Sequence, residues 1–209
     1  MKRLLSVIVL VSIVTMSGIA FAIPITLDEV GVNNSVVING TFKSQINGTF
    51  NVLAGYYQLK INGADVVNGF CVDPAWAPKE PEAYDLRAID PNSVYAQAAY
   101  LFSLSNSSNA AAVQVAIWET VMGTDFTWNN PNPALESTVN GLLASINTGS
   151  FDLSRYSLAV SPGNVPSGYG LGYQDYIVAI PSPVPEPSTL ILLGAGLGGF
   201  ALWRKRSGK

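Results

Sequence analysis

The stretch YYQLKINGADVVNGFCV, residues Tyr56–Val72, carries the clearest structural signal in the chain. Tyr56–Ile61 and Asp65–Val72 are rich in residues that favour β-strands, and Asn62-Gly63 stands between them. An Asn-Gly pair favours the two-residue turn of a β-hairpin because both residues tolerate a positive φ. The stretch therefore predicts a β-hairpin with Cys71 near the end of its second strand.

Further strands are predicted before this hairpin and helices after it. Val36–Ile38 and Phe50–Leu53 are runs of β-formers, with turns expected at Asn39-Gly40 and Asn47-Gly48. The hydrophobic period then becomes helical over residues 91–104, 109–122 and 133–146. Tyr173–Ile180 returns to a strand pattern. The predicted fold class is α+β, a β-rich domain with a helical insertion.

Two of the three predicted helices have more specific signals. Asn109 and Gly123 are placed to begin and end the second helix. The third helix is predicted to be amphipathic, with one apolar side formed by Leu135, Val139, Leu142, Leu143 and Ile146. We expect that side to pack on the core.

Both ends of the chain carry targeting features. Met1–Ala22 has a basic start, an apolar centre and Ala20-Phe21-Ala22, which is the pattern that a signal peptidase reads. We interpret it as a cleaved signal, since its apolar centre is short for the alternative, a transmembrane helix of about 20 residues. Pro181–Pro187 predicts a stiff spacer, and residues 188–209 predict a single transmembrane segment with a basic tail.

The C-terminal segment resembles a PEP-CTERM sorting signal. Pro185-Glu186-Pro187 precedes a Gly-rich apolar run and the basic cluster Arg204-Lys205-Arg206, in that order. The resemblance implies an exported protein of a Gram-negative bacterium that makes exopolysaccharide, with an exosortase in the inner membrane as its processing partner. It also implies anchoring in the inner membrane, transient or permanent, before display on the cell surface or in the matrix. Residues 23–180 would then form one extracytoplasmic domain.

The composition of this domain excludes several classes of protein. Between Ile23 and Glu186 there are 14 acidic residues and only five basic ones, a net charge of about −9. An acidic domain repels polyanions, so nucleic acid is a poor candidate partner. The chain contains no histidine, which excludes Ser-His and Cys-His catalytic pairs and histidine metal sites. No Gly-rich phosphate loop or calcium loop is apparent.

Cys71 is the only cysteine, so it has no partner for a disulfide within the chain. The remaining possibilities are an inert buried thiol, an intermolecular disulfide, a lipidated or metal-bound thiol, and a thiol that is used covalently. Lipidation is disfavoured because Cys71 lies far from the predicted cleavage point. One cysteine without histidine is also a weak metal site, and we expect no cofactor.

Two glutamines stand in apolar surroundings. Gln114 lies in AAAVQVAIWETV, residues Ala110–Val121, and a helix that is apolar on all sides is a buried one. A buried amide without partners costs about 1–3 kcal/mol, so Gln114 should be held by specific hydrogen bonds. Gln174 lies in the predicted strand Tyr173–Ile180, where an ordinary solvent-facing position is the alternative.

Together these segments resemble the thioester (TQxA-type) domains of bacterial surface adhesins. Phe70-Cys71-Val72 matches the aromatic-Cys-apolar motif of that family. Val113–Trp118, VQVAIW, matches the helix motif, except that Val113 replaces the usual threonine and removes one hydroxyl. Tyr173–Val178 matches the later glutamine motif. The resemblance covers roughly residues 56–180.

The resemblance implies an internal thioester between Cys71 and Gln174. Gln114 would be the supporting amide of a helix motif that includes Ala116 and Trp118. A thioester is an activated acyl group, which a surface protein amine or a polysaccharide hydroxyl on a target could capture. Such capture happens once, so the expected protein is a covalent adhesin and not an enzyme.

Two other readings stay open. A non-covalent structural or glycan-binding matrix protein with an inert thiol is favoured by polar and aromatic segments such as Thr127–Asn130, which could stack on sugars. A hydrolase is less favoured because Cys71 has no histidine base. Four carboxylates follow the cysteine, and we expect them to form a solvated surface or a weak calcium site, not a glycosidase pair: Asp73, Glu80, Glu82 and Asp85.

Overall fold

The computed structural model describes residues 22–43, 48–73, 81–129, 132–149, 151–161 and 173–180 of the 209-residue chain. The predicted signal peptide before Ala22, the Pro-rich spacer, the predicted transmembrane segment and Glu80 lie outside these residues. Within the described ranges, no helix has both the length and the apolar character that crossing a membrane requires.

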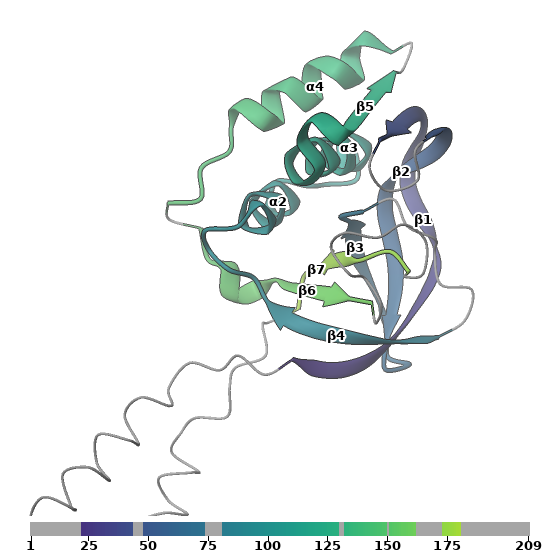
Figure 1. Cartoon of the computed structure of the whole chain (residues 1–209), viewed down its shortest axis with the longest axis vertical. Helices are drawn as coiled ribbons and strands as arrows, with labels where there is room; N and C mark the ends of the chain where they lie inside the picture. The colour runs from purple at the N-terminus through teal and green to yellow at the C-terminus, as the bar shows by residue number, and fades with distance from the viewer. Residues whose placement is uncertain are drawn as a thin grey trace, which may run out of the picture. The chain divides into compact units, whose positions relative to one another are not determined.

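Seven antiparallel strands form one sheet that closes into a ring (Figure 1). The strands follow the order β2-β3-β7-β6-β4-β1, and β1 pairs again with β2 along its second edge. β5 extends the sheet by pairing with the C-terminal part of β1. Closure gives a small barrel with an inside and an outside. The strands are β1 (Ile23–Phe42), β2 (Gly48–Ile61), β3 (Val66–Cys71), β4 (Glu82–Ala88), β5 (Phe126–Asn129), β6 (Ser157–Val160) and β7 (Tyr176–Val178).

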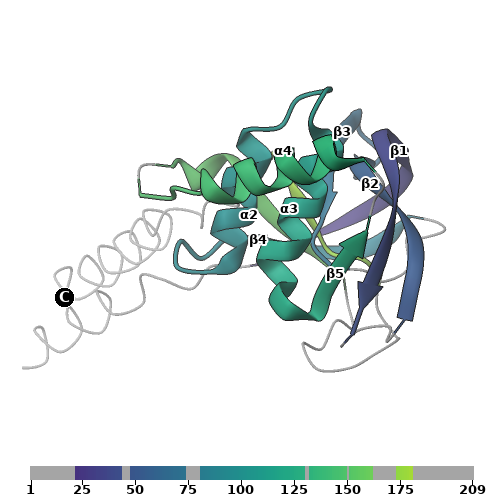
Figure 2. The same ribbon diagram turned by 90° about the horizontal axis from the view of Figure 1, so that it is seen from above.

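Three helices lie together on one side of the strands, as Figures 1 and 2 both show. They are α2 (Val94–Ser103), α3 (Ala110–Met122) and α4 (Pro133–Ala144). α3 is the central helix and contacts α2, α4 and β2. Its residues Ala110–Trp118 are all buried, as expected for a helix with apolar residues on every side. Two short 3-10 turns, η1 (Gly123–Asp125) and η2 (Leu153–Arg155), complete the described elements.

The predicted hairpin at Asn62-Gly63 is confirmed. β2 and β3 pair antiparallel, and the turn residues Asn62 and Gly63 have φ values of 53° and 70°. Positive φ at both central residues is the requirement of the turn that Asn-Gly favours. Cys71 is the last residue of β3, as predicted.

The prediction of a turn at Asn39-Gly40 is wrong. Both residues lie inside β1, opposite Asn51 and Phe50 of β2. A Cβ at Gly40 would stand 3.0 Å from the ring of Phe42, so this glycine provides room for an aromatic side chain and not a turn. The predicted strands Val36–Ile38, Phe50–Leu53 and Tyr56–Ile61 are accordingly parts of the two long strands β1 and β2.

The helix predictions are confirmed with shorter bounds. Asn109 takes the N-cap position of α3, but its Oδ1 accepts from Asn106 N instead of capping the helix. Gly123 ends α3 with φ 55°. In α4, Leu135 and Val139 are buried, and the rest of the predicted apolar side is partly buried against the core: Leu142, Leu143 and Ile146.

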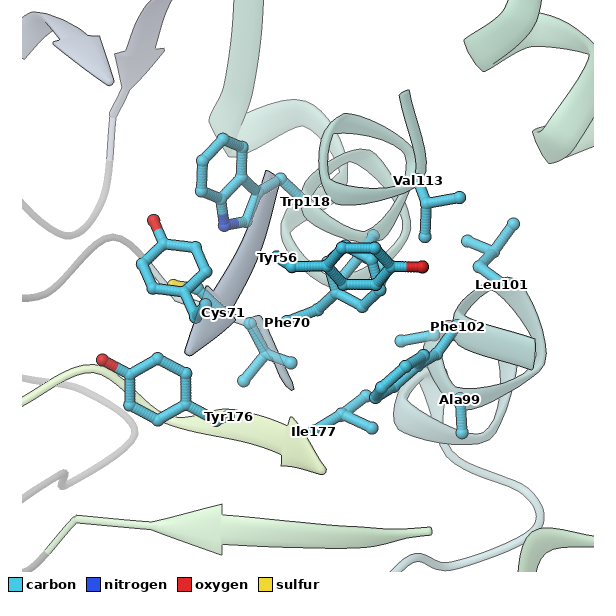
Figure 3. Close-up of a cluster of buried hydrophobic side chains, with 14 of the residues drawn as sticks. Tyr56, Phe70, Cys71, Ala99, Leu101, Phe102, Val113, Trp118, Tyr176 and Ile177 are labelled. Carbon is cyan, nitrogen blue, oxygen red and sulfur yellow. The ribbon is translucent and has the colours of Figure 1, made fainter. Parts of the chain in front are cut away.

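Adjacent residues of β3 and β7 point to opposite faces, as strand geometry requires. Phe70 pairs with Ile177, and its ring meets those of Tyr56 and Phe102 beneath the helices (Figure 3). Cys71 pairs with Tyr176 on the other face, where the Tyr176 ring meets other tyrosines of the barrel. Cys71 and Phe70 therefore lie on opposite faces of β3, within one buried core.

Gly55 provides a test of the β1–β2 pairing. β1 has an irregularity between Asn33 and Val36, opposite Gly55, and a Cβ at Gly55 would lie 2.7 Å from both Asn33 O and Ser35 Cβ. We expect Gly55→Ala to lower the free energy of unfolding by about 1–3 kcal/mol through overpacking. Urea denaturation measures this change.

The matched control is Gly141→Ala in α4, where an added Cβ would meet nothing within 4 Å. Alanine is a better helix former than glycine, so this variant should gain about 0.5–1 kcal/mol. Equal effects of the two substitutions would contradict the close approach at Gly55.

Candidate functional site

Cys71 ends β3 with a fully buried side chain. Its Sγ donates a hydrogen bond to the carbonyl oxygen of Asp73. Burial is the largest influence on the thiol and raises its pKa well above the usual value, because the charged thiolate loses its hydration. A thiol so enclosed is not available for an intermolecular disulfide in this conformation.

Gln114 of α3 holds the backbone of Cys71 from both sides. Cys71 N donates to Gln114 Oε1 at 3.1 Å, and Gln114 Nε2 donates to Cys71 O at 2.7 Å. Both residues are fully buried. The prediction that Gln114 is a buried amide in a specific hydrogen-bond arrangement is confirmed, and the two glutamine bonds fix the end of β3 to the central helix.

Trp118 lies one helical turn after Gln114 and faces the same cysteine. Figure 3 shows the nitrogen side of its indole ring turned toward Cys71. The buried Nε1 makes no regular hydrogen bond to any described residue, but its interaction with the sulfur favours the thiolate and lowers the pKa of Cys71. This effect is smaller than that of burial. Ala116, between the two residues, is also buried.

Gln174 immediately precedes a segment that is fixed beside Cys71. Val72 N donates to Asp175 O at 2.9 Å, and Asp175 N donates to Asp73 Oδ1 at 2.7 Å. The buried Asp175 carboxylate in turn accepts from Ser161 N at 2.7 Å. The residues that follow the cysteine and the residue that follows Gln174 are thus joined by reciprocal hydrogen bonds.

The side chain of Gln174 lies among tyrosine hydroxyls. Tyr176 Oη lies 3.1 Å from Gln174 Oε1, and Tyr84 Oη donates to the Gln174 backbone oxygen at 2.8 Å. The carboxamide also interacts with the Tyr57 hydroxyl, and this interaction lowers the pKa of Tyr57. Gln174 is half-buried, in contrast to the fully buried Cys71. The alternative of an ordinary solvent-facing strand residue is therefore excluded for Gln174.

Glu29 of β1 completes this group. Its Oε2 accepts from Tyr176 Oη at 2.5 Å, and desolvation raises the pKa of the carboxyl. The pKa values of Tyr57, Tyr84 and Tyr176 are raised as well, with burial as the largest cause. Burial in this cluster therefore favours the neutral forms of Glu29, Cys71 and the three tyrosines.

Sequence reasoning missed Glu29 and the three tyrosines. What these four residues share is a position on strands that become neighbours only when the barrel closes, and the sequence does not show which strands are neighbours. β4, which carries Tyr84, does alternate in burial at Tyr84 and Leu86. That alternation could have identified the strand but not its neighbours.

Three of the carboxylates that follow the cysteine are described, and each has a different partner. Asp73 accepts from Asp175 N, Glu82 accepts from Tyr173 Oη, and Asp85 forms an ion pair with Arg87. Among the described residues, no three acidic or cysteine side chains are placed to hold a metal ion. Trp128, a candidate for sugar stacking, is half-buried and donates its indole N–H to Glu119.

One comparison with known proteins gives a match. The PEP-CTERM protein-sorting motif matches residues 183–206. The chain carries a PEP-CTERM sorting motif. This motif implies export, processing by an exosortase and attachment to the cell surface after sorting. Pro185, Glu186 and Pro187 all lie in the matched range.

No curated protein and no solved structure matches the chain. The matched residues 183–206 lie outside the described part of the chain, so the match concerns sorting and not the barrel.

Proposed function

We propose that this exported PEP-CTERM protein is a covalent surface adhesin, with an internal thioester between Cys71 and Gln174. The observation that carries the proposal is the pair of Gln114 hydrogen bonds to the backbone of Cys71, together with the bonds that fix Asp175 to Val72 and Asp73. These contacts hold the thiol residue and the neighbour of Gln174 in one rigid arrangement. Preorganisation of this kind favours reaction between two groups of the same chain.

The two glutamines differ in a way that supports their assigned roles. Both ends of the Gln114 amide are engaged by the backbone of Cys71, so attack on that amide would break two buried hydrogen bonds. Gln174 contacts tyrosine hydroxyls instead and is half-buried. The second position suits an acyl group that must later meet a target.

Thioester formation and the later capture of a target require no cofactor. Cys71 Sγ attacks Gln174 Cδ, a C–S bond forms, the C–N bond breaks, and the thiol proton leaves with the amide nitrogen as ammonia. A target amine or hydroxyl then attacks the same carbon, the C–S bond breaks, and the proton of the attacking group returns to sulfur. The chain of events runs once and leaves the target linked to residue 174.

One observation favours the non-covalent alternative. Burial raises the pKa of Cys71, and a protonated buried thiol is a poor nucleophile. A matrix protein with an inert thiol would keep the same fold and the same sorting signal. The Trp118 interaction opposes this effect, but burial is the larger influence.

Mass spectrometry of the intact purified protein separates the two functions. Thioester formation should lower the mass by about 17 Da, the ammonia that is lost, and methylamine should then add and release one titratable thiol. Both signals should disappear in Cys71→Ala and Gln174→Ala. Gln97→Ala, at an exposed position of α2, should keep both signals and serves as the matched control.

A full sequence mass with no methylamine adduct would contradict the thioester. Gln114→Ala distinguishes the two glutamines, since it should retain part of the bond while Gln174→Ala retains none. The reverse result would exchange their roles.

A further inference from the structure

The hydroxyl of Tyr176 lies between a carboxyl oxygen of Glu29 and the carboxamide oxygen of Gln174. When Glu29 is ionised, both of these oxygens can only accept a hydrogen bond. Tyr176 Oη is 2.5 Å from Glu29 Oε2 and 3.1 Å from Gln174 Oε1. A phenol has one hydrogen to donate, so it cannot serve both acceptors at once. Whichever acceptor receives that hydrogen, the other faces a lone pair on Tyr176.

The orientation of the Gln174 amide follows from its other neighbour. Tyr57 Oη donates its hydrogen to Leu53 O at 3.3 Å, so toward Gln174 it can only accept. The Gln174 side chain lowers the pKa of Tyr57, as a donor to the phenol oxygen does. An N–H of the carboxamide is the group that can donate to Tyr57, and Oε1 is the atom that lies 3.1 Å from Tyr176 Oη. The carboxamide oxygen is the one that becomes the acyl oxygen of the proposed thioester.

Protonation of Glu29 resolves the competition for the hydrogen. A neutral Glu29 can donate to Tyr176 Oη, and Tyr176 is then free to donate to the acyl oxygen of residue 174. An ionised Glu29 instead takes the Tyr176 hydrogen in a short charge-assisted bond. The hydrogen bond to the acyl oxygen exists only in the first arrangement.

We propose that Tyr176 activates the acyl carbonyl of residue 174 by hydrogen bonding, and that Glu29 is a positioning residue whose protonation turns this activation on. The inference rests on the proposed function. When an amine attacks the acyl carbon, negative charge develops on the acyl oxygen, and a fixed donor at that oxygen stabilises the transition state. The adhesin thus captures targets faster at pH values below the pKa of Glu29 and more slowly once Glu29 is ionised.

The other groups around Glu29 do not reverse this dependence. The carboxylates of Asp73, after β3, and Asp175, before β7, act on some of the same groups. The residues that the charge of Glu29 itself influences are Cys71 on β3, Tyr57 on β2, Tyr84 on β4 and Tyr176 on β7. All four are acids whose pKa values are raised, so they remain neutral while Glu29 titrates. No basic side chain of the described residues contributes to the shift of Glu29.

The test measures capture of hydroxylamine by the thioester form of the full protein at a series of pH values. The rate constant is calculated on the free-base concentration of hydroxylamine, which removes the titration of the nucleophile itself. For the native protein, we expect this constant to fall as pH rises through the titration of Glu29. Intact mass follows the adduct.

Three variants make the test specific. Tyr176→Phe removes the donor and should slow capture on the order of 100-fold at low pH, with little remaining pH dependence. Glu29→Gln stays neutral and can donate to Tyr176, so its rate should stay high across the range. Glu82→Gln is the control, because Glu82 accepts from the different tyrosine Tyr173, and it should keep the native profile.

The outcomes separate the two proposals. A native mass equal to the full sequence mass means that no thioester forms, and the proposed function fails together with this inference. A mass lower by about 17 Da, with native, Tyr176→Phe and Glu29→Gln proteins showing the same pH profile, leaves the thioester intact and overturns the role of Tyr176 and Glu29 alone.

Discussion

Replacement of Gln114 by alanine is expected to lower the free energy of unfolding by about 2–4 kcal/mol. The side chain supplies one acceptor and one donor to the backbone of Cys71, and all of these groups are buried. Alanine would leave the Cys71 N–H and carbonyl without these partners, and each unsatisfied buried group is costly. Urea denaturation with an unchanged m-value measures the effect.

Gln97→Ala in α2 is the matched control for this measurement. Gln97 is an exposed helical glutamine, and alanine has a high helix propensity, so the change should stay within about 0.5 kcal/mol. A similarly small loss for Gln114→Ala would contradict the two hydrogen bonds at Cys71.

Trp118→Ala is expected to cost about 3–5 kcal/mol, as large-to-small changes of buried aromatic residues do. The indole is almost fully buried, and its ring meets Phe42 and Phe126 at centroid distances of 5.9 and 5.6 Å. Removing it creates a cavity between α3 and the β1–β5 part of the sheet. Thermal or urea unfolding measures the loss.

Two further substitutions separate packing from the indole nitrogen. Trp118→Phe keeps an aromatic ring and removes an N–H that has no regular hydrogen bond among the described residues, so it should cost clearly less than alanine. Trp128→Ala, at a half-buried tryptophan, should also cost less. Equal losses at Trp118 and Trp128 would argue against Trp118 as a core residue.

Local chemistry decided which parts of the fold could be predicted from the sequence. Asn62-Gly63 forms a turn because both residues take positive φ between two strands that pair antiparallel. Asn39-Gly40 has the same two residue types but continues a strand, because Phe42 needs the space beside Gly40. Tertiary packing, which a dipeptide does not contain, separates the two cases.

The closing strands could not be placed from local patterns. β6, four residues long, was not predicted, and the predicted strand Tyr173–Ile180 is reduced to the three residues of β7, with Gln174 before it. Strand β4 was not predicted, although its buried residues Tyr84 and Leu86 alternate with more exposed ones. Short strands depend on non-local partners more than on their own residues.

The candidate site also contains residues that could be predicted from the sequence and residues that could not. Gln114 could be recognised because an amide inside a wholly apolar helix requires a partner, and the structure supplies Cys71. Glu29 and Tyr176 could not be recognised, because they lie far apart in sequence and meet only inside the barrel. A polar residue in an alternating strand gives no sign of which residue it faces.

The position of Gln174 near the end of the described domain has a mechanical consequence. The sorting motif begins at residue 183, shortly after β7 in the chain. If a target is bonded to the side chain of residue 174, a pull between target and cell surface runs through the covalent backbone of residues 174–183. The helices and most of the barrel lie outside that line of tension. Within the described domain, β7 is the strand on that line, and its pairing with β3 and β6 would carry the load.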